Sequence, residues 1–208
     1  MQLILVRHGE TEYNRADVFR GRVDLPLNER GRMQARAAAS CLRETDFEAF
    51  YSSPLRRSME TARAIAEPHG GEVRPLEEFN DVDYGLWSGK SVDEVREAWP
   101  ELFSIWVDNP EEVVFPEGES LRAVRERLQA GLDRLAEQHD GTILLVGHKL
   151  INRLLICIVL DLPTAAFWHV DQSNGAINVI AHGELGWVLR RMNDVGHLKG
   201  MESADQRT

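Results

Sequence analysis

Two apolar segments, far apart in the chain, each end at a histidine. Residues 2–6 (QLILV) run directly into Arg7 and His8, and the late stretch GTILLVGH repeats this design and ends at His148. Such runs are typical of central strands in a sheet that is covered on both faces. Reactive groups of open α/β sheets collect beyond the carboxyl ends of the strands. Either histidine alone could be an ordinary strand end, but the pair, with arginines nearby, favours a reaction centre.

Helices and strands alternate between these two runs. The spacing predicts a helix from Asn28, its N-cap, to about residue 44, a strand at 47–53, and a helix with Ser53 as N-cap and Pro54 as first residue. This alternation predicts an α/β fold. The later pattern predicts helices at 92–99, 120–139 and 150–160, and closing strands at 175–180 and 187–191.

Arg56 and Arg57 fall in the first turn of the helix predicted after Pro54. The helix macrodipole disfavours cations at this end. A local rule that is broken without an evident gain often marks a functional site. We therefore expect one of the two arginines to serve a site, and the other to be a solvated residue at the helix start.

Composition limits the class of protein. The 208 residues suffice for one substantial domain with a buried core, and the net charge of −10 works against non-specific binding to nucleic acid or anionic membranes. Cys41 and Cys157 are expected to be buried free thiols. No signal peptide is expected, and the apolar residues 154–160 are too few to span a bilayer. We expect a cytoplasmic protein.

Six motifs together resemble a known family. In order and spacing they resemble the phosphoglycerate mutase-like branch of the histidine phosphatase superfamily: RHGETEYN, RGRVDLPLNERGRMQA, SSPLRRSMETA, DVDYGLWSG, PEGES and LLVGHKLINRLL. The resemblance implies a three-layer α/β/α fold around a mostly parallel sheet. It implies one domain over residues 1–198 with a small cap insertion at about 86–116, and we expect residues 199–208 to be a disordered tail.

The resemblance also implies roles for single residues. His8 would be the nucleophile that becomes a phosphohistidine, and Arg7, Arg57 and His148 would surround the phosphoryl oxygens. Asn14 would donate a hydrogen bond to the phosphate. No metal ion and no other cofactor would be required. Gly9 follows the nucleophile, where we expect a side chain to crowd the bound group.

The proton donor departs from the family pattern. Most relatives have a glutamate four residues before the glycine that corresponds to Gly85, and here that residue is Asp81. An ordinary aspartate is protonated in only about one molecule in a thousand at pH 7, so a general acid at this position needs a raised pKa. Asp83 or Glu78 could replace Asp81 in this role.

Lys149 is a second departure, because relatives usually have glycine after the second histidine. Together with Arg20 and Arg22 in the loop after the nucleophile, it suggests a substrate with more than one negative group, and we expect Gly21 between them to border that substrate. The alternative is that these cations point to solvent or form surface ion pairs.

The sequence is compatible with three functions. The first is a metal-independent phosphatase of a small phosphorylated metabolite, with inorganic phosphate as product; the second is a cofactor-dependent phosphoglycerate mutase; the third is a non-catalytic protein that binds a phosphorylated ligand. Mutases typically have a longer segment before PEGES, so the short segment here favours hydrolysis. The sequence does not identify the substrate. It leaves the oligomeric state open, with a homodimer as one alternative.

Overall fold

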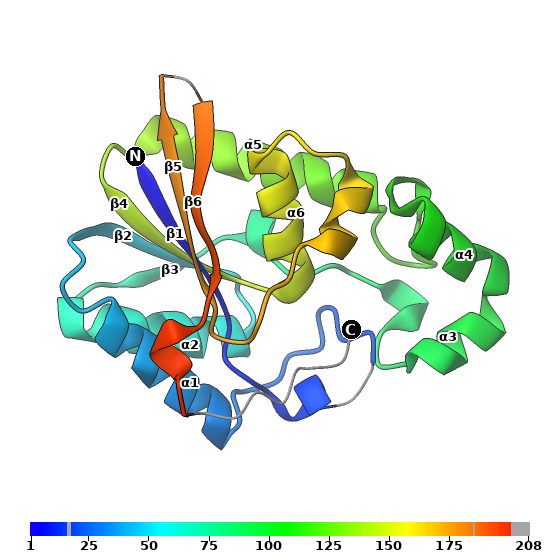
Figure 1. The fold of residues 1–208 in the computed structure, drawn as a ribbon. Coiled ribbons are helices and arrows are strands. Elements are labelled where there is room, and N and C mark those ends of the chain that lie inside the picture. The colour runs from blue at the N-terminus through cyan, green and yellow to red at the C-terminus, as the bar shows by residue number, and fades with distance from the viewer. Residues whose placement is uncertain (16–17, 185, 201–208) are drawn as a thin grey trace.

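A six-stranded sheet with the strand order β3-β2-β4-β1-β5-β6 lies at the centre of the computed structural model, which describes residues 1–15, 18–184 and 186–200 (Figure 1). The strands are β1 (Gln2–Arg7), β2 (Phe47–Ser52), β3 (Val73–Pro75), β4 (Thr142–Gly147), β5 (Ile177–Gly183) and β6 (Gly186–Asp194). The α-helices are α1 (Glu29–Cys41), α2 (Arg56–Ala66), α3 (Val92–Ala98), α4 (Pro100–Asp108), α5 (Leu121–Gln138) and α6 (Lys149–Val159). Short 3-10 helices join them: η1 (Glu12–Arg15), η2 (Glu67–His69), η3 (Glu77–Phe79), η4 (Gly85–Trp87), η5 (Pro110–Glu112), η6 (Thr164–His169) and η7 (Gly196–Leu198).

The sheet is mostly parallel, as the sequence predicts. β3, β2, β4 and β1 run in the same direction, β5 pairs antiparallel with β1, and β6 pairs antiparallel with β5. The two apolar runs are neighbouring strands, and their register places Arg7 opposite Gly147. Both runs therefore end at the same edge of the sheet.

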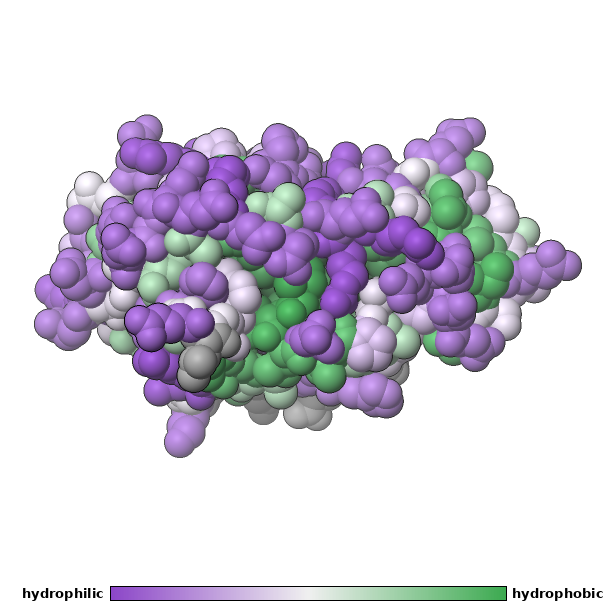
Figure 2. Space-filling model, turned by 90° about the horizontal axis from the view of Figure 1, so that it is seen from above, coloured by the Kyte–Doolittle hydropathy of each residue, from purple (hydrophilic) through white to green (hydrophobic). Residues whose placement is uncertain are grey.

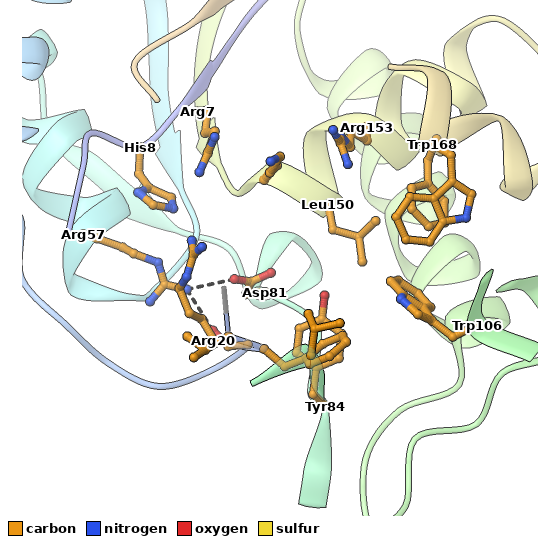
Figure 3. Close-up of a pocket in the computed structure, with 16 residues that line it drawn as sticks. Arg7, His8, Arg20, Arg57, Asp81, Tyr84, Trp106, Leu150, Arg153 and Trp168 are labelled. Atoms are coloured by element: carbon orange, nitrogen blue, oxygen red, sulfur yellow. Dashed lines mark hydrogen bonds and ion pairs between the residues drawn. The ribbon is translucent and has the colours of Figure 1, made fainter. Parts of the chain in front are cut away.

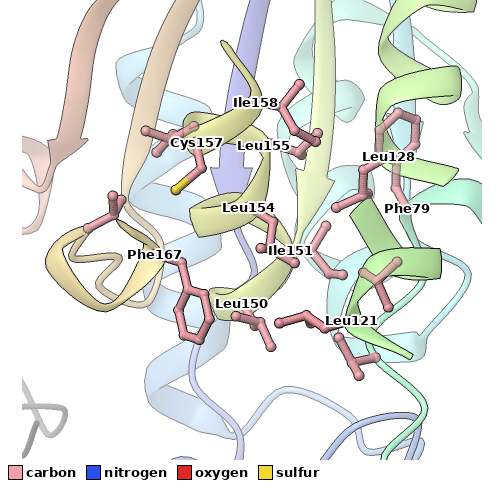
Figure 4. Close-up of a cluster of buried hydrophobic side chains, with 14 of the residues drawn as sticks. Phe79, Leu121, Leu128, Leu150, Ile151, Leu154, Leu155, Cys157, Ile158 and Phe167 are labelled. Carbon is pink, nitrogen blue, oxygen red and sulfur yellow. The ribbon is translucent and has the colours of Figure 1, made fainter. Parts of the chain in front are cut away.

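Helices cover both faces of the sheet, which confirms the three-layer architecture. Leu3 and Leu5 of β1 pack on the side of α5 and α6, whereas Ile4 and Val6 pack on the side of α1 and α2. Figure 4 shows the interior between α5 and α6, where side chains such as Leu128 and Leu154 meet. Outside, the face seen in Figure 2 carries mainly hydrophilic side chains. The central strands are continuously apolar because both of their faces are buried.

Two predicted helix starts are confirmed by their caps. The Asn28 side chain accepts a hydrogen bond from Gly31 N at the start of α1, and the Ser120 side chain accepts one from Ala123 N at the start of α5. These bonds satisfy backbone donors that the first turn of a helix leaves without a partner. α1 ends at Cys41, three residues before the predicted end.

The predicted start of α2 is wrong. The helix begins at Arg56 rather than at Pro54, and its N-cap Leu55 has no side-chain capping bond. Ser53 does not cap the helix because its hydroxyl lies 2.6 Å from His148 Nε2. The Ser53 side chain, which the sequence predicts to cap the helix, instead contacts His148 at the edge of the sheet.

The segment 86–116 is more regular than the sequence suggests. The short helix predicted at 92–99 is α3, which ends at Ala98, but Pro100 then begins α4. Proline is tolerated at the first position of a helix, where no backbone N–H is needed. The sequence pattern did not predict α4.

Cys41 is exposed, so the prediction of two buried thiols holds only for Cys157. Cys41 is the last residue of α1, whereas Ala38 and Ala39 form the buried face of that helix. Residues 199 and 200 form a turn after η7, and the rest of the tail predicted to be disordered, 201–208, lies outside the described residues. No helix in the described part of the chain is both long and apolar enough to cross a membrane.

The first turn of α1 packs directly against the loop that follows β1. A Cβ atom at Gly31 would overlap the backbone of Glu10, and a Cβ atom at Gly9 would overlap the backbone of Gly31. The two backbones can approach this closely only because both glycines lack a side chain. The structure thus gives Gly9 a different role from the predicted one, since the obstacle is α1 rather than a bound group.

We predict that Gly31→Ala destabilises the protein, although alanine has the higher helix propensity. The added methyl group would overlap the Glu10 backbone, and overpacking of this kind lowers the free energy of unfolding by about 1–3 kcal/mol. Chemical denaturation measures the difference. Ser40→Ala, at an exposed position of the same helix, is the control and should not destabilise. A more stable Gly31→Ala protein would contradict the close contact.

Candidate active site

His8 and His148 lie side by side at the edge of the sheet where β1 and β4 end. The His8 backbone N–H donates to Gly147 O (3.0 Å), which continues the strand pairing by one residue. The centroids of the two imidazole rings are 5.2 Å apart. The structure therefore brings together the two histidines that the sequence singled out.

Arg57 joins them from the first turn of α2. Its guanidinium group donates to Val23 O (2.7 Å), Gly21 O (2.8 Å) and Asp81 Oδ2 (2.8 Å). Arg56 is exposed and lies 3.8 Å from the Glu60 carboxylate. The expectation that only one arginine of the pair serves a site agrees with this geometry.

A cavity of about 220 Å³ opens beside these groups (Figure 3). Seven of the predicted site residues line it: Arg7, His8, Arg20, Gly21, Arg57, Asp81 and Lys149. Neither His148 nor Asn14 lines it. His148 stands against the His8 ring, and Asn14 Oδ1 accepts hydrogen bonds from the Thr11 N–H (2.8 Å) and hydroxyl (3.0 Å).

The His8 imidazole is buried and neutral. Burial lowers its pKa well below the usual value, and Arg57, His148 and Arg7 lower this pKa further. Its Nδ1 lies 2.7 Å from Gly9 O, and a carbonyl oxygen only accepts, so Nδ1 carries the proton. The lone pair of a neutral ring is then on Nε2, the opposite nitrogen.

Asp81 is the one carboxylate among the cavity-lining residues that the structure describes. Burial raises its pKa, although Arg57 and the Val82 N–H, which stabilise the charged form, oppose the shift. The two alternatives lie elsewhere: Asp83 is 3.6 Å from Arg22, and Glu78 pairs with Arg134 at 2.6 Å. Of the three candidate acids, Asp81 is the one that lines the cavity.

The His148 ring is fixed by a residue whose role the sequence did not reveal. Burial lowers the pKa of His148, and Arg57 and Arg7 add to the effect. Its Nε2 lies 2.6 Å from Ser53 Oγ, and its Nδ1 lies 3.5 Å from Asp81 Oδ2. In the sequence, Ser53 precedes a predicted helix and was therefore interpreted as its N-cap, so its contact with His148 was not predicted.

The predicted loop cations divide into two kinds. Arg20 lines the cavity, whereas Arg22 does not, because it pairs with Glu119 at 2.6 Å and donates to Asp81 O at 3.1 Å. Lys149, the first residue of α6, also lines the cavity. The alternative of a structural ion pair therefore applies to Arg22.

The segment before β5 holds the end of β1. The Arg7 guanidinium donates to Gln172 O (2.6 Å), Asn174 Nδ2 donates to His8 O (3.2 Å), and the Gly175 N–H donates to Arg7 O (3.1 Å). η6 lies immediately upstream of this segment and contributes two residues, Phe167 and Trp168, to the cavity wall.

Several cavity residues were not recognised in the sequence. The missed residues are distributed over several parts of the chain: Val18, Phe19, Tyr84, Val92, Trp106, Leu150, Arg153, Phe167 and Trp168. The tryptophan-rich composition of residues 86–116 was the only available signal, and it did not indicate which ring faces the cavity. Tertiary packing brings these side chains together.

Comparisons with known proteins agree with this geometry. Residues 3–195 match the family model described as the histidine phosphatase superfamily (branch 1). The chain is 37% identical to phosphoserine phosphatase 1 of Hydrogenobacter thermophilus, over 95% of this chain and 94% of the relative. It is 29% identical to the adenosylcobalamin/alpha-ribazole phosphatase of Escherichia coli, over 93% and 96% of the two chains.

The fold also matches the folds of solved structures. YhfR from Bacillus stearothermophilus superposes with a TM-score of 0.89 at 26% identity, over 95% of this chain and 99% of that one. Family match, sequence identity and fold agree over almost the whole chain. The chain belongs to branch 1 of the histidine phosphatase superfamily.

Proposed function

We propose that this phosphoric monoester hydrolase removes the phosphoryl group of a small phosphomonoester through a phosphohistidine on His8. The observation that carries the proposal is the state of the His8 ring: it is neutral, with Nδ1–H held by Gly9 O, so Nε2 is free to act as a nucleophile. His8 lines the cavity next to Arg7 and Arg57.

In the first step, the Nε2 lone pair forms a bond to phosphorus and the bond from phosphorus to the ester oxygen breaks. Arg7 and Arg57 neutralise the phosphoryl oxygens, and His148 donates a hydrogen bond to one of them. All of these groups belong to the protein, so we propose that no metal ion is needed. Arg20, Gly21 and Lys149 border the substrate from the cavity wall.

Asn14 does not line the cavity, but its side-chain amide is a further candidate donor to the phosphoryl group. Its Nδ2 is buried and forms no hydrogen bond within the described part of the chain, while its Oδ1 is held by Thr11. A buried amide donor of this kind is costly unless a ligand uses it. We assign that use to a phosphate oxygen.

Asp81 completes the cycle as the proton carrier. In its protonated form it gives its proton to the leaving alkoxide, and as a carboxylate it then removes a proton from the water that attacks the phosphohistidine. Inorganic phosphate leaves and His8 regains its lone pair. The raised pKa of Asp81 supports the acid role. We also propose that residues 86–116 cap the alcohol side of the cavity, since Val92 and Trp106 line it.

We predict that purified protein releases phosphate from 4-nitrophenyl phosphate in the presence of a chelator. His8→Ala should lower this rate by about three orders of magnitude or more, because it removes the nucleophile. Rapid quenching with labelled substrate should trap an acid-labile phosphoryl label on the wild-type protein and none on His8→Ala. Activity that requires an added divalent metal would contradict the mechanism.

His182→Ala is the matched control, because His182 lies on β5 far from the edge where β1 ends. It should keep both the activity and the label. The same assays with 3-phosphoglycerate separate the main alternative. Release of phosphate supports a phosphatase, whereas isomerisation that depends on a bisphosphoglycerate would show a mutase.

We predict that Asp81→Asn slows the hydrolysis of alkyl phosphates by about 100-fold or more, because their poor leaving groups need a proton. Aryl phosphates, which leave as stable anions, should be affected by less than about 10-fold. As the pH rises through the pKa of Asp81, the acid is lost, so the wild-type rate on alkyl phosphates should fall, and this limb should be absent in the variant. Asp83→Asn is the control and should keep the wild-type profile. Equal losses on both substrate classes would refute the proton-donor role.

A further inference from the structure

One wall of the cavity is apolar and lies opposite the phosphoryl site. In Figure 3, His8, Arg7 and Arg57 occupy one side of the cavity, Trp106 and Trp168 occupy the other, and Asp81 and Leu150 lie between them. The apolar lining residues are Val18, Phe19, Tyr84, Val92, Trp106, Leu150, Phe167 and Trp168. The proposed chemistry uses none of these side chains.

The aromatic part of this wall is held in place. The Trp106 ring lies 5.4 Å from Phe167 and 5.2 Å from Trp168, and the last two rings are 4.5 Å apart, measured between centroids. Trp106 and Phe167 are buried, but 41% of Trp168 is exposed. A large aromatic surface that faces a cavity while its neighbours fix it is suited to contact with a ligand.

The position of Asp81 determines which part of the substrate would reach this wall. If the phosphoryl group binds at His8 and Arg57 and the ester oxygen faces Asp81, the alcohol extends away from Arg7 and Arg57. It then extends past Leu150 towards Trp106 and Trp168 (Figure 3).

We infer that the wall formed by Tyr84, Trp106, Leu150, Phe167 and Trp168 is the leaving-group subsite, and that it takes an alcohol bearing an aromatic ring or a hydrocarbon group of similar size. This inference rests on the proposed phosphatase function. A small polar alcohol such as that of phosphoserine would leave the apolar wall in contact with water, and transferring such surface out of water is favourable.

The test uses substrates that share one type of leaving oxygen. Ethyl phosphate and 2-phenylethyl phosphate are both esters of primary alcohols, so their chemical steps are alike and only the apolar group differs. We expect kcat/KM for 2-phenylethyl phosphate to exceed that for ethyl phosphate by about 10- to 100-fold, as the burial of a phenyl group allows. It should also exceed kcat/KM for O-phosphoserine.

Trp168→Ala should reduce the ratio of the two kcat/KM values by about 3- to 10-fold, since part of the buried surface is lost. Trp187→Ala makes the same substitution on β6, outside the cavity lining, and should leave the ratio unchanged; thermal unfolding confirms that both variants are folded. A ratio near one, a preference for O-phosphoserine, or an equal effect of the two variants would overturn the subsite. Loss of all phosphate release in the wild type would instead count against the proposed function.

A different observation concerns Ser53, which is fully buried at the end of β2. Its Oγ lies 3.4 Å from the Leu55 N–H, which donates to it, and 2.6 Å from His148 Nε2. Because Oγ accepts from the Leu55 N–H, its own proton remains available for a hydrogen bond to the imidazole nitrogen. A neutral ring that accepts at Nε2 carries its own proton on Nδ1.

The geometry points to Ser53 as the positioning residue that holds His148 in the Nδ1–H tautomer. His148 Nδ1 is buried and forms no hydrogen bond within the part of the chain that the structure describes, and it faces the Asp81 carboxylate at 3.5 Å. In this tautomer Nδ1–H is a donor towards the phosphoryl site, whereas the other tautomer would present a lone pair to a phosphate oxygen.

The experiment compares Ser53→Ala with Ser58→Ala, whose Oγ is 3.5 Å from the same nitrogen. We expect Ser53→Ala to lower kcat by about 10- to 100-fold with a smaller change in KM, and Ser58→Ala to cost less than about 3-fold. Nitrogen-15 NMR of the histidines should show Nδ1–H for His148 in the wild type and not in Ser53→Ala. Ser53→Thr, which keeps the hydroxyl, should recover the tautomer. An Nδ1–H signal that persists in Ser53→Ala, or a kcat within 2-fold of the wild type, would overturn the assignment.

Discussion

The hydrogen bond from the His8 N–H to Gly147 O extends the pairing of β1 and β4 one residue past the strands, and the arrangement of the site depends on it. Parallel strands in this register end together, so the residues that follow them emerge as neighbours. The two imidazoles therefore face each other without any long loop to position them. Arg57 reaches the same edge from the first turn of α2, and Asp81 reaches it from the segment before η4.

The charges and pKa values of the site residues result from their close packing around one small cavity. The chain as a whole carries a net charge of −10, yet Arg7, Arg57 and Lys149 line the cavity and, among its described lining residues, Asp81 is the one acid. Burial next to two guanidinium groups keeps both imidazoles neutral, and a neutral imidazole is what a nitrogen nucleophile requires. The same burial raises the pKa of the single carboxyl group. One local environment thus produces the protonation states that our proposal requires of His8 and Asp81.

The sequence allowed the sheet, and the proximity of His8, His148 and Arg57 at its edge, to be predicted because both depend on local pattern. An apolar strand followed by histidine is visible within eight residues, and Arg57 is conspicuous as a cation at a helix start. The apolar wall could not be predicted, because Trp106 and Trp168 come from separate helices and meet only through packing. Ser53 was misread because the residues after it resemble a helix start, and α4 was missed because the sequence pattern of residues 86–116 is mixed.

The short connection between η6 and β5 links the two sides of the cavity. Only residues 169–171 separate Trp168 from Gln172, whose carbonyl oxygen accepts from Arg7, and Gly175 N then donates to Arg7 O. A displacement of Trp168 would also strain the backbone that contacts Arg7. The apolar wall and Arg7 are thus connected through one short segment of backbone. If this wall is the leaving-group subsite that we infer, the range of accepted alcohols is most readily altered by exchanging its side chains, because moving the segment that carries Trp168 would also displace the backbone that binds Arg7.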